Sequence, residues 1–346
     1  MSELGSGSDV LQWVASVEET FGDHPAYGRF EHGIVWIDEP GPDGRPIGGT
    51  DPTAMIREIN AEGWPLLHGH DPGRPLGRVI AARAFVSEGG QAFAAAIFGF
   101  YSADKQIGFA ALGVDSGAPV KLPDTLPAPR PEWRIEIAYD DRDAGSDWVR
   151  AAAAEAPLPC KVVGASYNSE SELLHLVTVC LPYAALVWNP TIKAIGEAAG
   201  KDIYAAVRTW VRGMFVRVRD RKRPVICTQV DIRGCQTEFL FRGGDLQLNY
   251  EAHDALPGAA VQAGALIANF ASRGVPAARV VYEFHLDKRR WYPAYAVLDD
   301  GRLVSDENLL IAVERLPSEL SLGILSRAER PLPASSRRPL QPVDPE

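Results

Sequence analysis

The first third of the chain consists mainly of short apolar runs in which hydrophobic and polar positions alternate, as they do in β-strands. The segment "GIVWID" (33–38) is the clearest, and similar runs follow it between Gly, Pro and Asp turns. The last predicted strand is "IGFAALGVD" (107–115). A helix interrupts the pattern at 51–63, where Asp51 can cap the first turn and Gly63 can end the last.

These patterns divide the chain into two predicted domains. An N-terminal helix and tail (1–25) precede a small β-rich domain (26–114), and five prolines within 115–133 indicate an extended linker. Residues 134–328 mix helical and strand patterns and predict a mixed α/β domain with a largely antiparallel sheet. Residues 329–346 are expected to be disordered. The expected fold class is therefore α/β of the α+β type.

Two predictions inside the second domain concern the limits of its helices. Residues 170–218 are expected to be helical. Residues 246–251, "LQLNYE", follow the predicted strands 224–232 and 235–241 and are expected to be a third antiparallel strand. A separate helix is expected over 257–274.

Charge and cysteine content narrow the classes of function. The chain has 346 residues and a formal net charge of −10, which argues against a surface that coats nucleic acid or an anionic membrane, but allows a local basic patch. Its four cysteines form no CxxC pair, so we expect no zinc ribbon and no other metal. The glycine-rich phosphate loops of nucleotide enzymes are missing, and no cofactor is expected.

Several features favour a cytoplasmic location without a membrane partner. Scattered cysteines in a long chain are typical of reduced, cytoplasmic proteins. The N-terminus lacks the basic and apolar regions of an export signal. The most apolar run, residues 173–188, contains Pro182 and is shorter than the roughly 20 apolar residues of a membrane helix. This run is expected to be a buried core segment.

The stretch "WPLLHGHDPGRPLGRV" (64–79) has two interpretations. The sequence "HDPG" (70–73) suits a tight turn, because Asp71 precedes proline and glycine allows a positive φ. Alternatively, His68, His70 and Asp71 take part in catalysis or binding. His68 and His70 share one face of a strand, but two ligands alone are weak support for a metal.

This stretch, together with "GIVWIDEPGPDGRPIGGTDPTAMIREI" before it, resembles the phage prohead maturation proteases, serine peptidases that trim scaffold during capsid assembly. The resemblance covers residues 27–115. It implies a catalytic His70, with Asp71 beside it, and a nucleophilic serine on a later strand.

At the position that corresponds to this serine, the chain has alanines. The matching stretch, "QIGFAALGVD" (106–115), contains Ala110 and Ala111. The nearest serines, Ser102 and Ser116, lie in flanking turns. A protease-like domain without its nucleophile would be a pseudoenzyme that keeps a groove for a peptide.

Two polar segments of the second domain are further candidates. Seven cations lie within residues 207–224, where they either bind nucleic acid or phosphate or complement the end of a helix. They are Arg208, Arg212, Arg217, Arg219, Arg221, Lys222 and Arg223. In "YEFHLDKRRW" (282–291), Glu283, His285 and Asp287 share one face of a strand, which suits a metal or acid–base chemistry. We favour a solvent face, with the alternating Tyr282, Phe284 and Leu286 in the core.

Three hypotheses of function follow. The first is a non-catalytic binding or scaffold protein that recognises a peptide or a partner protein, in the phage-related or antiviral-defence setting that the resemblance implies. The second is an active serine peptidase that uses His70 and an unassigned serine. The third is a sensor that binds nucleic acid or a phosphorylated ligand through residues 208–223. A homo-oligomer is compatible with each.

Overall fold

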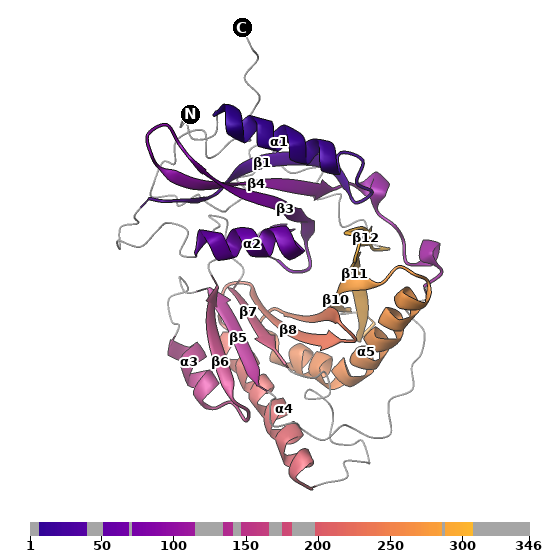
Figure 1. Ribbon diagram of the computed structural model, residues 1–346. Helices are drawn as coiled ribbons and strands as arrows, with labels where there is room; N and C mark the ends of the chain where they lie inside the picture. The colour runs from indigo at the N-terminus through magenta and orange to yellow at the C-terminus, as the bar shows by residue number, and fades with distance from the viewer. Residues whose placement is uncertain are drawn as a thin grey trace. The chain divides into compact units, whose positions relative to one another are not determined.

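The computed structural model describes residues 7–39, 51–68, 71–114, 134–140, 147–165, 175–181, 198–285 and 288–306 (Figure 1). These residues form two units, each with its own sheet. Of the described residues, those up to Gln106 belong to unit 1 and those from Ile107 onward belong to unit 2. Helices and mostly antiparallel or mixed sheets confirm the predicted α+β fold class.

Unit 1 contains a four-stranded antiparallel sheet with the strand order β1-β4-β3-β2. Its main elements are α1 (Ser8–Phe21), β1 (Tyr27–Ile37), α2 (Pro52–Glu62), β2 (Trp64–Leu67), β3 (Pro75–Val86) and β4 (Ala92–Tyr101). The helix α2 has the predicted ends. Asp51 Oδ1 accepts a hydrogen bond from the backbone N–H of Thr53, and Gly63 has a φ of 67°.

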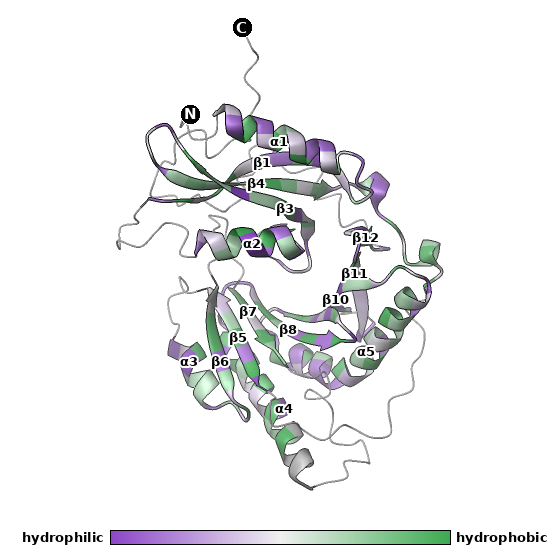
Figure 2. Ribbon diagram, in the orientation of Figure 1, coloured by the Kyte–Doolittle hydropathy of each residue, from purple (hydrophilic) through white to green (hydrophobic). Residues whose placement is uncertain are grey.

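The two helices of unit 1 lie on opposite faces of its sheet (Figure 1). On one face, Val14 of α1 packs with Phe93 and Ile97 of β4. On the other, the side chain of Asn60 in α2 donates to the backbone carbonyl of Ala82 at 2.9 Å and accepts from its N–H at 2.8 Å. Because both faces are covered, β4 is buried along almost its whole length, and Figure 2 shows it as predominantly hydrophobic.

The predicted strand at 107–115 is wrong over its described part. Residues 107–114 belong to unit 2, and Ala110–Leu112 form a short 3₁₀ helix, η4. Phe109 is buried in the unit 2 core, and Gly113 has a φ of 63°, which favours glycine. The glycine permits a tight turn and the buried Phe109 anchors it, so this apolar run does not extend the first sheet.

Unit 2 contains an eight-stranded sheet with the order β12-β11-β10-β9-β8-β7-β5-β6. Its elements are η4, β5 (Ile135–Asp140), α3 (Asp147–Ala154), β6 (Cys160–Ala165), β7 (His175–Cys180), α4 (Ala198–Val218), β8 (Pro224–Ile232), β9 (Cys235–Arg242), α5 (Leu246–Ser272), β10 (Ala277–His285), β11 (Arg290–Leu298) and β12 (Leu303–Val304). The pairs β9–β10, β7–β8 and β5–β6 are parallel, and the other pairs are antiparallel.

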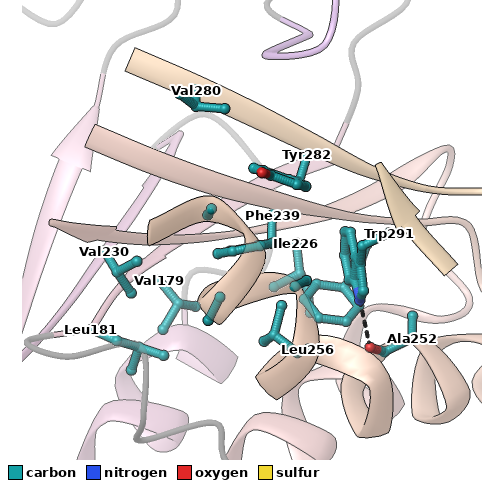
Figure 3. Close-up of a cluster of buried hydrophobic side chains, with 14 of the residues drawn as sticks. Val179, Leu181, Ile226, Val230, Phe239, Ala252, Leu256, Val280, Tyr282 and Trp291 are labelled. Carbon is teal, nitrogen blue, oxygen red and sulfur yellow. Dashed lines mark hydrogen bonds between the residues drawn. The ribbon is translucent and has the colours of Figure 1, made fainter. Parts of the chain in front are cut away.

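The helices α3, α4 and α5 all pack into one core on the same face of this sheet. Figure 3 shows part of that core, where the Trp291 indole N–H donates to the carbonyl of Ala252 at 2.8 Å. The indole N–H of Trp210 in α4 similarly donates to the carbonyl of Ala152 in α3 at 2.7 Å. The opposite face of the sheet carries none of the described helices of unit 2.

Two secondary-structure predictions in unit 2 are wrong. Residues 246–251 are the first turns of α5 rather than a strand, because Asp245 caps the helix by accepting from the N–H of Leu248 at 3.1 Å. Within the predicted helical region 170–218, residues 175–180 form β7 instead. The β-branched residues of "HLVTVC" fit between β5 and β8, where their pairing outweighs the helical spacing.

Candidate functional site

The structure places Asp71 in a turn between β2 and β3. Its carboxylate Oδ1 accepts from the backbone N–H of Gly73 at 2.9 Å, and the N–H of His68 donates to the carbonyl of Arg74 at 2.9 Å. These bonds agree with the turn interpretation of the segment. His70 lies outside the described residues, and its catalytic role stays a prediction.

The serine and alanine positions of the peptidase hypothesis are separated between the two units. Ser102 belongs to unit 1 and directly precedes the 3₁₀ helix η3 (Ala103–Lys105), where its hydroxyl donates to the carboxylate of Asp104. This hydrogen bond is the main reason that the pKa of Asp104 is lowered. Ala110 and Ala111 are exposed residues of η4 in unit 2, and Ser116 lies outside the described residues.

Most cations of the basic segment 208–223 form ion pairs or a ring contact within unit 2. Arg208 and Arg212 of α4 both donate to the same oxygen, Oδ1 of Asp254 in α5, the latter at 2.6 Å. Among the other cations, Arg217 pairs with Glu155, Arg219 pairs with Asp220 at 3.1 Å, and the Arg221 guanidinium lies 6.0 Å from the Trp148 ring centroid. Lys222 and Arg223 lie in the turn before β8. Most of these contacts join α4, or the turn that follows it, to α5 or to the region of α3.

The residue that precedes Asp254 in α5 is a buried histidine. His253 of α5 is 1% exposed, and its ring contacts those of Phe215 and Phe241. Neither ring nitrogen has a hydrogen-bond partner among the described residues. Burial, assisted by the charges of Arg212 and Arg208, lowers the pKa of His253 to about 3, so its ring is neutral at physiological pH.

The third candidate, residues 282–291, divides between the two faces of β10. Tyr282 and Phe284 pack into the core, as the favoured interpretation predicts. Glu283 lies on the other face and accepts from Arg242 Nε of β9 at 3.1 Å. His285 Nδ1 accepts from the N–H of Lys288 at 3.3 Å. Leu286 and Asp287 lie outside the described residues, and the described part of the chain holds no cluster of three metal-ligating side chains.

A buried ion pair on the same face of the sheet was not predicted. Glu238 of β9 accepts from Arg279 of β10 through both carboxylate oxygens, at 3.1 and 2.7 Å, and also from Gln236 at 2.5 Å. The two charged side chains are only 4% and 14% exposed. The sequence signal is a single acidic residue directly before the apolar run "FLF" (239–241) of β9.

The cysteines on the Glu238 face of the sheet, Cys180 and Cys227, are protonated thiols rather than nucleophiles. Burial raises the pKa of Cys180 to about 12, with a further contribution from the charges of Glu136 and Glu238. Burial likewise raises the pKa of Cys227 well above its ordinary value. All four cysteines of the chain are free.

A different kind of candidate site is the outer edge of β1. This strand has 11 residues and, among the described strands, pairs only with β4. Irregular register near its two ends leaves Arg29–Ile34 in continuous pairing with β4. The side chains of Arg29 and Glu31 form a surface ion pair at 3.3 Å, and the Arg29 guanidinium lies 4.5 Å from the Phe100 ring centroid.

Comparison of the chain with family models, curated proteins and solved structures finds no match. Within the described residues, none of the helices combines the length and the apolar character that crossing a bilayer requires.

Proposed function

We propose that this chain is a non-catalytic binding protein, whose unit 1 binds an extended segment of a partner protein as an additional strand beside β1. The observation that carries the proposal is the length of β1, 11 residues, together with its single neighbour among the described strands. An edge strand presents unpaired N–H and C=O groups, which an extended peptide can satisfy with its own backbone.

The other sheet edges are less suitable for strand addition. At the opposite edge of the same sheet, β2 has four residues and includes Pro65, which has no N–H to donate. In unit 2, β12 has two residues, and Ile107 already bridges to its Val304. The other edge strand of unit 2, β6, has six residues. Among the described residues, β1 is therefore the longest sheet edge.

The surroundings of Ser102 support binding rather than peptide hydrolysis. A nucleophilic serine needs a base that can take its proton, and a neutral histidine serves this purpose. The Ser102 hydroxyl instead donates to the ionisable carboxylate of Asp104, whose lowered pKa makes it a poor base. The phage-related or antiviral-defence setting is part of the proposal and rests on the sequence resemblance alone.

Selection of random linear peptides on the full chain tests the proposal. Along an edge strand, successive N–H groups point alternately to the neighbouring strand and to the open side. Of the two variants Phe30→Pro and Glu31→Pro, one therefore removes an outward N–H and the other an N–H bonded to β4. The variant that loses only the outward N–H should keep the wild-type circular dichroism. It is expected to bind the selected peptides at least about tenfold more weakly, a loss of about 1.4 kcal/mol of binding free energy.

The matched control is Glu88→Pro, at an exposed position of the turn between β3 and β4, which should leave peptide affinity unchanged. The proposal is wrong if no peptide is selected, or if the selected peptides bind equally well to the folded proline variant of β1.

A further inference from the structure

The two arginines that meet at Asp254 leave a local excess of positive charge. Arg208 and Arg212 lie one helical turn apart on α4, and both donate to the same carboxylate oxygen. The neighbouring acidic residue of α5, Glu251, is paired with Arg289. Two guanidinium groups therefore share one carboxylate, which leaves a net charge of about +1 at a surface where Asp254 is 45% exposed.

Three buried nitrogen atoms beside this cluster have no hydrogen-bond partner among the described residues. They are Nε of Arg212 and the two ring nitrogens of His253. The Arg212 guanidinium lies 4.8 Å from the Tyr250 ring centroid, and the rings of Tyr250 and His253 both contact that of Phe215. Leaving a buried polar group unpaired costs about 1–3 kcal/mol, so unpaired nitrogens on neighbouring side chains indicate a group that these residues do not supply.

We propose that Arg208, Arg212 and His253 form a receptor for one tetrahedral oxyanion, such as the phosphate monoester group of a small ligand. Asp254 occupies this receptor as an internal competitor when the ligand is absent. The planar guanidinium of arginine matches the oxygens of phosphate, and Nε of Arg212 and one N–H of His253 add donors on the buried side.

A third arginine of the same helix carries no excess charge. Arg217 of α4 pairs with Glu155, one cation with one carboxylate, so that no charge is left over. Arg219 similarly pairs with Asp220. Within the pairs described for 208–219, the excess charge is confined to Arg208 and Arg212. A site for one phosphate group fits this distribution better than a long nucleic-acid track, which needs a series of available cations.

The test is titration of the full chain with inorganic phosphate by calorimetry, at constant ionic strength. Asp254→Asn removes the internal competitor and is expected to raise phosphate affinity at least tenfold. Arg212→Gln is expected to lower it at least tenfold. Glu155→Gln is the matched control, because it also removes a carboxylate partner from an arginine of α4, but it should leave phosphate affinity unchanged. Circular dichroism establishes that each variant is folded.

Several results would overturn the proposal. One is equal phosphate affinity in Asp254→Asn and Glu155→Gln. It would show that the ion pairs of Asp254 only hold α4 and α5 together. Another is acetate binding as tightly as phosphate, which would show a general anion effect. A third is a single-stranded oligonucleotide that binds more tightly than phosphate, with a steep salt dependence that Arg212→Gln reduces, which would assign the site to nucleic acid. If Asp254→Asn does not fold, Arg208→Lys, which keeps the charge but loses the planar fork, must still weaken phosphate binding.

Discussion

The two sheets of this chain differ in how many of their faces are covered by described helices. The sheet of unit 1 has α1 on one face and α2 on the other, whereas α3, α4 and α5 all cover one face of the sheet of unit 2. The central strands differ accordingly. Apart from Tyr101 at its end, all residues of β4 are apolar or glycine, while β9 directs Phe239 and Phe241 into the core and Glu238 to the opposite face.

This difference shows how a sheet accommodates charge. A strand covered on both faces by helices has no position at which a charged side chain can find a partner, so it becomes a continuous apolar run. A strand covered on one face can carry a charge on the other, but the Glu238 side chain is still only 4% exposed and depends on Arg279.

The largest effect is expected from separating the buried pair of unit 2. Arg279→Met leaves the Glu238 carboxylate buried without its cation, which should lower the free energy of unfolding by about 3–5 kcal/mol. Replacing both residues, Glu238→Leu with Arg279→Met, should recover most of this loss, because no uncompensated charge remains. Urea denaturation followed by tryptophan fluorescence measures both. A double variant no more stable than the single one would contradict this account of the pair.

The next effect concerns the two covered faces of unit 1. Ala95 packs with the α1 side of β4, and Ala96 lies on the opposite side; both are fully buried. Ala95→Asn and Ala96→Asn should each cost about 2–4 kcal/mol, because the amide is both oversized and unpaired. Arg83→Gln, at an exposed position of β3, is the control. If only one of the two asparagine variants is destabilised, the faces are not equally closed.

The pH dependence of stability should include one buried histidine from each unit. Burial lowers the pKa of His32 to about 4 and that of His253 to about 3, while an unfolded histidine titrates near 6.5. The unfolded chain then binds more protons, so this stability is complete above about pH 6.5 and is lost as the pH falls towards the folded pKa values. Each histidine should contribute about 1.4 kcal/mol per pH unit within that window.

Denaturation at pH 6.5 and pH 5 measures this effect in the wild type, His32→Phe and His253→Phe. Each variant should lose less stability on acidification than the wild type does. An unchanged difference between the two pH values would show that the histidine in question is already protonated or solvated in the folded state.

The smallest effects are expected for the more exposed ion pairs of each sheet. Arg242, 32% exposed, pairs with Glu283 in unit 2, and Arg29, 57% exposed, pairs with Glu31 in unit 1. Arg242→Gln should cost about 1 kcal/mol and Arg29→Gln less than about 0.5 kcal/mol. A larger loss for Arg29→Gln would show that burial does not rank these pairs.

Local patterns in the sequence were sufficient for much of the fold. The cap at Asp51 and the stop at Gly63 predict α2, and the apolar runs between Gly, Pro and Asp turns predict strands such as β4. The failures occurred where two signals compete. At 246–251 the alternation of "LQLNYE" suggested a strand, but the cap supplied by Asp245 starts a helix there.

The candidate sites were harder to predict than the fold, because they depend on contacts between residues far apart in the chain. The arginines of α4 are conspicuous in the sequence, but their shared partner Asp254 is more than 40 residues away. Glu238 and Arg279 meet only because β9 and β10 are parallel neighbours joined through α5. No local spacing rule signals either contact.

The measurement that most directly tests the proposed function is amide hydrogen exchange in β1, followed residue by residue by NMR with and without a selected peptide. Strand addition predicts that alternate amides within Arg29–Ile34, those that point to the open edge, exchange rapidly in the free protein and become protected when the peptide binds. Peptide-induced protection confined to other elements, with β1 unchanged, would contradict the proposal.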